Sequence, residues 1–174
     1  TFQHQIDFIQ SSGIVTAMVG LLQAIPGTKL FERLQAEGRL RSLVSGDNAD
    51  GTTNIVPTMP PEVLQTGYRR IVQTIYSPRL LCERIQTFLQ EYSLPHNRVR
   101  LHRQHILAFL RSVYRLGIVD RGRRHYWRLL LWALLHRPRA FPMAVALAIY
   151  GYHFRKSGDR LPSFDAASGS LPTT

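Results

Sequence analysis

The residues whose side chains could do chemistry are few and scattered. Cys82 is the only cysteine, which excludes an internal disulfide and any metal cage made of several cysteines of this chain. His102 and His105 stand three positions apart, a spacing that lets two histidines of one helix bind the same metal ion. Because no carboxylate or third histidine stands at a helical offset from them, we expect no metal site there.

Other catalytic patterns are missing from the sequence. Asp47, Asn48, Asp50 and Asn54 could supply oxygen ligands, but their spacing does not give the D-x-[DN]-x-[DN]-G run and closing glutamate of a calcium loop. The sequence contains neither a G-x-S-x-G nucleophile turn nor a G-x-x-x-x-G-K phosphate loop. We therefore expect no catalytic residues in this chain.

Charge is the most unusual property of the composition. Lys and Arg number 22 against 11 Asp and Glu, so the formal net charge is +11, and only Lys29 and Lys156 are lysines. Beyond Arg98 the acidic residues are Asp120, Asp159 and Asp165. Such a chain is attracted to polyanions, either nucleic acid or an anionic membrane. A set of solvated helix faces explains the same charge without any partner.

An apolar stretch near the start predicts the first structural elements. Residues 14–22 are rich in Val, Ile and Leu, without helical spacing or alternation, which is typical of a strand covered on both faces. Pro26 and Gly27 predict a turn, and Thr28 is a good N-cap for a helix over Lys29–Glu37 that Gly38 ends. Upstream, Ile6 and Ile9 indicate the end of an earlier helix.

This order of helix, strand, turn and helix is one unit of an α/β barrel or a doubly wound sheet. A single buried strand has no partner for its backbone hydrogen bonds, so one unit cannot fold alone. We therefore expect the rest of the sheet to precede Thr1, and the chain to be the C-terminal part of a longer protein.

The same residues carry a resemblance to a known family. The segment "VGLLQAIPGTKLFERLQAEGRL" resembles the late strand-turn-helix of radical S-adenosylmethionine (radical SAM) enzymes. The continuation from "SGDNADGTTNIVPTMPP" through "GYRRIVQTIYSP", and the later "RPR", resemble the uncharacterised domain that follows the barrel in many cobalamin-binding radical SAM proteins. The likeness covers roughly residues 5 to 156.

The resemblance implies cofactors for the parent protein rather than for this chain. It implies S-adenosylmethionine, a 4Fe-4S cluster held by a C-x-x-x-C-x-x-C loop, and cobalamin. No such loop is present here, so we expect none of these cofactors to be bound by this chain alone. The parent is expected to be a radical SAM enzyme, methyltransferase-like or related, whereas this chain lacks the cysteines that bind the cluster.

The resemblance also points to candidate cofactor contacts. Ligands of such barrels lie at the carboxyl ends of the strands, which here means Leu22, Gln23 and Ala24. In radical SAM enzymes that place lies near the adenine of SAM, so Leu22 and Gln23 are candidate SAM contacts. Equally, both residues could simply shape the turn, and for Ala24 this is the preferred interpretation.

The rest of the chain has helical periodicity. Leu64, Tyr68, Ile71, Val72 and Ile75 form one apolar face, and Leu81, Ile85, Phe88, Leu89 and Tyr92 form another after the N-cap Ser77 and Pro78. In a third helix Ile106, Phe109, Leu110 and Val113 face one way, Arg103, Arg111 and Arg115 face solvent or a partner, and Gly117 marks the end.

Two apolar helices near the end have two possible environments. They are expected at about Tyr126–His136 and Phe141–Phe154, with basic clusters outside them. Burial in the core is the preferred interpretation. However, a membrane interface also suits the aromatic residues beside arginines, which are Trp127, Trp132, Tyr150 and Tyr152.

We therefore expect a mainly α protein: an incomplete strand-turn-helix unit from a partial TIM-like barrel, followed by a helical domain. The expected divisions are a barrel piece over 1–42, a connecting loop over 43–61, the helical domain over 62–156 and a disordered tail over 157–174. The helical domain is expected to cap the barrel and shape substrate access, without being catalytic alone. The alternative is a non-catalytic basic helical module that binds anionic membrane or nucleic acid.

The expected partners are the missing N-terminal part of the same protein and a small-molecule or lipid substrate. Peripheral membrane contact is a further expectation, whereas nucleic acid is not the expected partner. The single cysteine, and the absence of a basic leader before the first apolar run, favour a cytoplasmic location, with or without membrane association.

Overall fold

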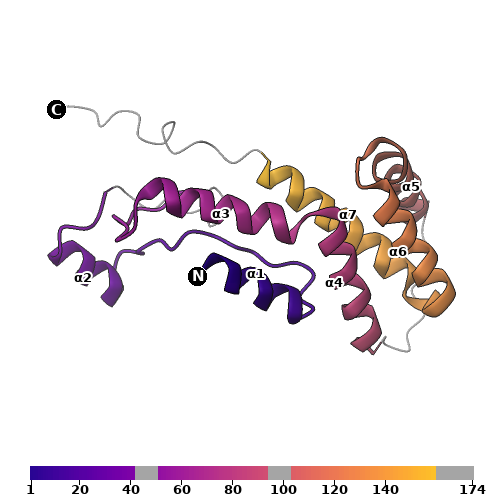
Figure 1. Ribbon diagram of the computed structural model, residues 1–174, viewed down its shortest axis with the longest axis horizontal. Helices are drawn as coiled ribbons and strands as arrows, with labels where there is room; N and C mark the ends of the chain where they lie inside the picture. The colour runs from indigo at the N-terminus through magenta and orange to yellow at the C-terminus, as the bar shows by residue number, and fades with distance from the viewer. Residues whose placement is uncertain (42–50, 94–102, 160–174) are drawn as a thin grey trace.

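The computed structural model describes residues 1–41, 51–93 and 103–159 (Figure 1). Within these ranges the protein is mainly α-helical, as the sequence predicts. The helices are α1 (Phe2–Ser11), α2 (Lys29–Ala36), α3 (Pro61–Ile75), α4 (Pro78–Glu91), α5 (Arg103–Ser112), the π-helical η1 (Val113–Val119), α6 (Arg123–His136), the short 3-10 helix η2 (Pro138–Ala140) and α7 (Phe141–Gly158). In the described ranges, β pairing is limited to a single bridge between Leu40 and Ile55.

Local sequence signals account for several helix ends. The Thr28 hydroxyl accepts a hydrogen bond from the backbone N–H of Phe31 at 3.3 Å, which confirms the predicted N-cap of α2. Gly38 follows α2 with φ +65°, the left-handed conformation expected there. Ser77 and Pro78 separate α3 from α4 as predicted, because proline suits the first turn of a helix.

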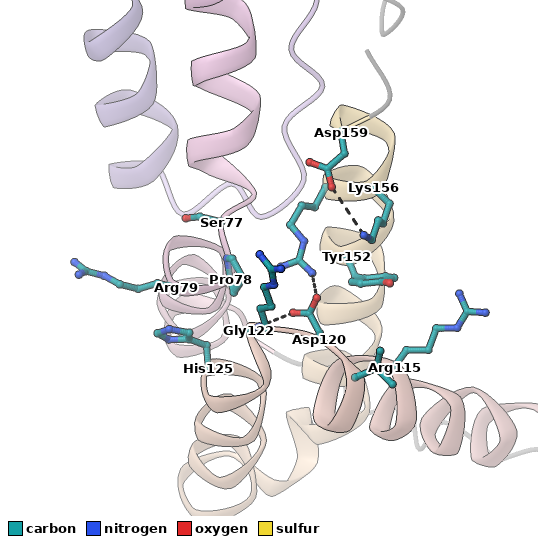
Figure 2. A pocket seen from close by; sticks show the side chains of 13 residues that line it. Ser77, Pro78, Arg79, Arg115, Asp120, Gly122, His125, Tyr152, Lys156 and Asp159 are labelled. Carbon is teal, nitrogen blue, oxygen red and sulfur yellow. Dashed lines mark hydrogen bonds and ion pairs between the residues drawn. The ribbon is translucent and has the colours of Figure 1, made fainter. Parts of the chain in front are cut away.

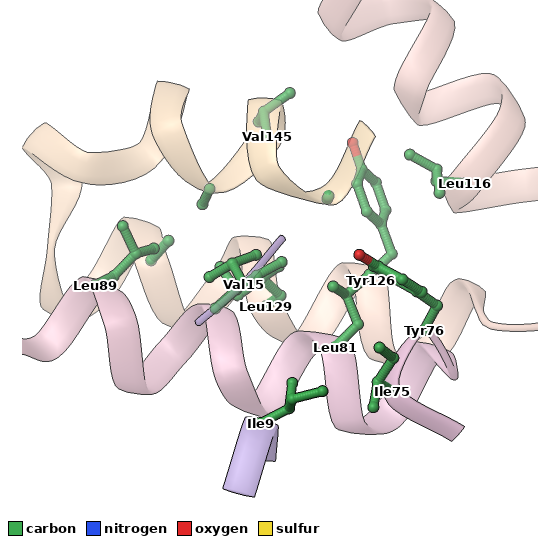
Figure 3. Packing of buried hydrophobic residues seen from close by; sticks show 14 of the residues in the cluster. Ile9, Val15, Ile75, Tyr76, Leu81, Leu89, Leu116, Tyr126, Leu129 and Val145 are labelled. Atoms are coloured by element: carbon green, nitrogen blue, oxygen red, sulfur yellow. The ribbon is translucent and has the colours of Figure 1, made fainter. Parts of the chain in front are cut away.

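The hydrophobic core lies between α3, α4, α6 and α7, with α1 closing one side (Figure 3). Ile75 and Ile85 are fully buried, and so is Leu129 of α6. Helix α7 approaches α4 closely because Gly151 has no side chain: a Cβ there would lie 2.2 Å from Cδ2 of Leu81. The two predicted apolar faces of α3 and α4 therefore belong to one core.

The expected strand over 14–22 is not formed. These residues run extended alongside α3 (Figure 1), but they pair with no strand in the described part of the chain. The expectation of burial on both faces is also wrong, because the exposed fractions of Ile14, Met18 and Leu22 are 46%, 73% and 67%. The physical reason is that, within the ranges that the structure describes, no neighbouring strand supplies backbone partners or covers the second face.

The third predicted helix differs from its prediction in face and in length. Ile106 and Leu110, expected to be buried, are 54% and 56% exposed. The face turned to α6 and α7 contains Ser112 and Leu116, together with Phe109 of the predicted face, whose ring centre lies 5.8 Å from that of Phe141. Gly117 does not end the helix, because the chain continues as a π-helix to Val119.

Parts of other predictions lie outside the described residues. These parts are residues 42–50, which include the acidic residues considered for calcium, residues 94–102, and residues 160–174. Within the predicted connecting loop, a short extended pairing forms near Asn54: the N–H of Arg41 donates to Asn54 O, and the N–H of Val56 donates to Arg39 O. Helix α7 extends to Gly158, beyond the expected start of the tail at residue 157.

Candidate functional site

Residues 14–24, called here the extended segment, lie against α3 and α4 with alternating burial. Val15 is buried, and Ala17, Val19 and Leu21 are half-buried. The residues between them point outward. A period of two is the geometry of a β-strand with one face covered, so the segment has the side-chain pattern of a strand without the partner strands.

Three side chains hold one backbone edge of the extended segment. We call Tyr68, Tyr76 and Arg84 the edge-binding trio. The Arg84 guanidinium donates to Val15 O at 3.3 Å. The Tyr76 hydroxyl donates to Ala17 O at 2.8 Å and accepts from Ala17 N–H at 3.1 Å, and the Tyr68 hydroxyl donates to Val19 O at 3.2 Å. The trio stands eight residues apart along α3 and α4 and supplies bonds that a neighbouring strand would otherwise make.

Arg84 is the most unusual member of the trio. It is fully buried, and its Nε–H has no hydrogen-bond partner in the described part of the chain. Its other donors reach Gln10 Oε1 at 3.0 Å and Val15 O, and its guanidinium lies over the Tyr76 ring. Burial lowers the pKa of Arg84 and raises that of Tyr76. Removal of its acceptors would leave a buried charge without partners, which is costly, so Gln10 and Val15 are needed to hold the guanidinium in place.

The opposite backbone edge of the segment is open. The N–H and C=O groups of Thr16, Met18 and Gly20 make no hydrogen bond within the described ranges. In an extended chain, alternate residues direct these groups to opposite edges. The segment therefore has one completed edge, one open edge and an outward apolar face.

Polar side chains of residues 52–54 fix the end of the extended segment, where the candidate SAM contacts lie. Asn54, 2% exposed, accepts from Ala24 N–H and donates to Ala24 O, both at 2.8 Å. The Thr53 hydroxyl donates to Leu22 O at 2.6 Å. Gln23 is 8% exposed, and its Nε2 lies 3.4 Å from O and Oγ1 of Thr52.

The two predicted SAM contacts thus differ in what they present. The Leu22 side chain is exposed and apolar, whereas the Gln23 side chain is turned into the chain. An exposed leucine can lie flat against an aromatic base, while the buried amide contributes to the local hydrogen-bond network. Whether either residue contacts SAM stays a prediction.

A basic cavity lies where η1, α6 and α7 meet the start of α4 (Figure 2). Its volume is about 690 Å³. Its charged lining residues are Arg79, Arg115, Asp120, Arg121, His125, Arg155, Lys156 and Asp159. Positive groups exceed negative groups, which favours anions over cations.

The carboxylate of Asp120 organises this cavity. It forms an ion pair with Arg155 and accepts from the N–H of Gly122 at 2.8 Å, so it connects α7 to the start of α6 (Figure 2). The Arg155 guanidinium lies 5.2 Å from the centre of the Tyr152 ring. Arg115 and Arg121 have no carboxylate partner in the described ranges and are available to an anion.

Metal chemistry finds no support in the described part of the chain. No group of three or more His, Cys, Asp or Glu residues there is arranged to hold a metal ion. Burial raises the pKa of the Cys82 thiol to about 12, which keeps it protonated and unreactive. His102 lies outside the described residues.

In the ranges 1–41, 51–93 and 103–159, no helix is long and apolar enough to cross a membrane.

Sequence reasoning missed the edge-binding trio. Arg84 falls inside the apolar face of α4, three residues after Leu81 and four before Phe88, and a charge at such a position is a usable signal. Tyr68 and Tyr76 look like ordinary core aromatics in sequence. Only the position of their hydroxyl groups against the extended segment identifies their role.

Comparison with known proteins places this chain in a family. Residues 28–161 match the model of a domain of unknown function, DUF4070. The chain is 26% identical over 154 residues to an uncharacterized methyltransferase of Synechocystis sp., with 86% of this chain and 28% of the relative covered. It is 25% identical over 148 residues to the hopanoid C-2 methylase of Rhodopseudomonas palustris, with 78% of this chain and 26% of the relative covered.

The chain spans only about a quarter of the length of these curated relatives. No solved structure matches it. The family model covers all of α2 to α7, so it describes the helical domain built above. The chain therefore belongs to the DUF4070 family, and its resemblance to the C-terminal part of cobalamin-binding radical SAM proteins is confirmed.

Proposed function

We propose that this chain is the C-terminal part of a radical SAM methyltransferase that uses cobalamin, and that its helical domain seats the last strand of the barrel. The observation that carries the proposal is the extended segment. It has the side-chain alternation of a strand, one edge completed by the edge-binding trio, and one edge without hydrogen bonds in the described ranges.

The open edge and the outward apolar face define what would pair with the segment. A parallel strand of the barrel would bond to Thr16, Met18 and Gly20 and would complete the sheet. Barrel helices packed on the sheet would cover Ile14 and Met18, which are 46% and 73% exposed. The helical domain then replaces a further strand on the other edge and closes the open side of a partial barrel.

The cofactors of such an enzyme would be held mostly by the rest of the protein. Three cysteines are required for the 4Fe-4S cluster, and this chain has only Cys82, a protonated thiol within α4. The residues present therefore do not fit a cluster. For SAM, the exposed Leu22 fits one face of an adenine ring. When bound, SAM would supply the methyl group or the radical, and this chain would orient the nucleoside.

The first test is to read the gene upstream of the codon for Thr1. The proposal expects an open reading frame that encodes a C-x-x-x-C-x-x-C loop in a barrel-type sequence. A frame that extends without this loop would refute radical SAM chemistry for the parent.

A biochemical test uses the intact protein reconstituted with its cluster. Leu22→Asp places a charge where the adenine would lie, and we expect a weaker affinity for SAM with unchanged iron content. Val63→Asp on α3, a residue 50% exposed and far from Leu22 in sequence, is the matched control. Equal affinities for SAM in both variants would remove Leu22 from the site.

A further inference from the structure

Helices α5, η1 and α6 carry large apolar side chains on their outward faces as well as on their core faces. We call this set the outer apolar surface. Its members on α5 and η1 are Ile106, Leu107, Leu110, Tyr114 and Ile118, and its members on α6 are Trp127, Leu131, Leu134 and Leu135. Their exposed fractions lie between 46% and 69%. Clusters of this kind mark interaction sites on proteins.

Helical spacing places each half of the surface on one face. Ile106, Leu110 and Tyr114 follow one another at steps of four, and Ile118 continues the series. This face lies opposite Leu116, which is buried, and Ser112, whose hydroxyl is 2.8 Å from the hydroxyl of Tyr126. The α5–η1 helix is therefore apolar on two opposite faces, of which only one is covered by the described residues.

The two halves meet at one contact. The indole N–H of Trp127 donates to Gly117 O at 2.9 Å, and a Cβ on Gly117 would lie 3.1 Å from the Trp127 ring. The ring therefore rests on η1 beside Ile118. This contact joins the apolar stripe of α5 and η1 to the apolar stripe of α6, so the two stripes form one continuous surface.

The three helices that carry the surface have no acidic side chain of their own. Helices α5, η1 and α6 contain no Asp or Glu. Their exposed arginines are Arg103, Arg111, Arg115, Arg123, Arg124 and Arg128. Within the described ranges none of these arginines pairs with a carboxylate. The basic cavity adjoins the surface, since its lining includes Arg115 and Val119, the residue after Ile118.

We propose that the outer apolar surface docks on an anionic lipid bilayer, with leucine and isoleucine side chains in the acyl boundary and arginines at the lipid phosphates. Exposed leucines on the same helices as arginines that have no carboxylate partner in the described ranges match the two layers of a bilayer surface, apolar inside and anionic outside. Trp127 and Tyr114 have the amphipathic rings favoured at that depth. The adjoining basic cavity, lined by Arg121 and His125, would hold a lipid headgroup phosphate.

A bilayer fits these observations better than a nucleic acid or a protein domain does. A nucleic acid would use the arginines but would leave the leucines of α6 exposed. A protein domain would require acidic side chains opposite six arginines and an apolar face between them. The inference does not depend on the proposed function, because it concerns only α5, η1, α6 and the cavity.

The test is co-sedimentation of the intact protein that contains this chain with lipid vesicles. The vesicles are phosphatidylcholine alone, or phosphatidylcholine with about one third phosphatidylglycerol to create a negative surface. We expect binding to the anionic vesicles that weakens with added salt. Leu131→Glu combined with Leu135→Glu, and separately Arg124→Gln combined with Arg128→Gln, should each weaken this binding by about tenfold or more.

Matched control variants are available on other helices. Val63→Glu on α3 adds a charge at a half-exposed apolar position, and Lys29→Gln combined with Arg33→Gln on α2 removes two exposed cations. Both controls should bind as wild type does, and circular dichroism should show all variants to be folded. Folded protein that does not sediment with anionic vesicles would overturn the proposal. The proposal would also be overturned if the arginine substitutions weakened binding to a DNA duplex while the leucine substitutions left binding to vesicles unchanged.

Discussion

Removal of one hydroxyl group should release the extended segment from the helical domain. Tyr76→Phe deletes the group that donates to Ala17 O at 2.8 Å and accepts from Ala17 N–H at 3.1 Å. The ring remains, so its stacking on Phe154 at 5.3 Å is kept. The effect of the substitution can therefore be assigned to the two hydrogen bonds.

The expected magnitude follows from those two bonds. Each contributes about 0.5–1.5 kcal/mol net, and more where the partner is left unpaired in a buried place. Tyr76 is 3% exposed, while Ala17 is half-buried and regains some hydration when the hydroxyl is lost. We therefore expect the free energy of unfolding to fall by about 2 kcal/mol. If the segment opens locally, exchange of the Ala17 amide should accelerate by about thirtyfold, since 1.4 kcal/mol is a factor of ten.

The assays are urea unfolding followed by circular dichroism and amide hydrogen exchange over residues 14–24. Tyr150→Phe is the control for an exposed tyrosine, because Tyr150 is 58% exposed, and its stability should change by less than about 0.5 kcal/mol. Tyr126→Phe removes one bond to Ser112 and should cost about 1 kcal/mol without faster exchange at Ala17. If Tyr76→Phe behaves like Tyr150→Phe in both assays, the edge-binding trio has no structural role.

Three other perturbations test separate contacts. Asn54→Asp should lower stability by about 2 kcal/mol in the same urea assay, because a buried carboxylate cannot donate to Ala24 O; unchanged stability would contradict the double hydrogen bond. Gly151→Ala should lower the free energy of unfolding by about 1 kcal/mol, because the clash of the new methyl group with Leu81 outweighs the gain in helix propensity. In a Leu81→Ala background the same Gly151→Ala substitution should instead be stabilising. Additive effects of the two substitutions would show that α4 and α7 do not touch there. The contribution of Cys82 to stability should be constant up to about pH 9 and should fall as the pH rises toward about 12, because the unfolded chain loses the Cys82 proton in this range while the folded chain keeps it. An equally steep fall in the stability of Cys82→Ala would assign the loss to other groups such as Tyr76.

Local sequence signals determined most of the helical architecture. Thr28, Gly38 and Pro78 set helix ends that the structure reproduces, because capping and proline geometry depend only on neighbouring residues. The apolar faces of α3 and α4 were also correct except at Tyr92, which is 37% exposed, since a helix with one apolar stripe has one way to bury it. The family resemblance came from an ordered series of such segments rather than from any single motif.

The third helix shows where periodicity fails. Its residues are apolar on two opposite faces, so the pattern alone cannot say which face is buried. Packing decided it: Leu116 and Ser112 turn toward Tyr126, and Ile106 and Leu110 are left outside. The sequence therefore shows that each residue of the outer apolar surface is apolar, but it does not show that these residues form one exposed surface.

The sequence by itself determined that residues 14–22 are apolar, extended and in need of partners. Only the tertiary structure decided which groups meet them. Tyr76 and Arg84 lie 59 or more residues from the backbone groups they bind, and hydrogen bonds between such distant residues leave no periodic trace. A buried arginine has no signature other than its position on an apolar face, because its role depends on the direction of donors that only the packed helices fix.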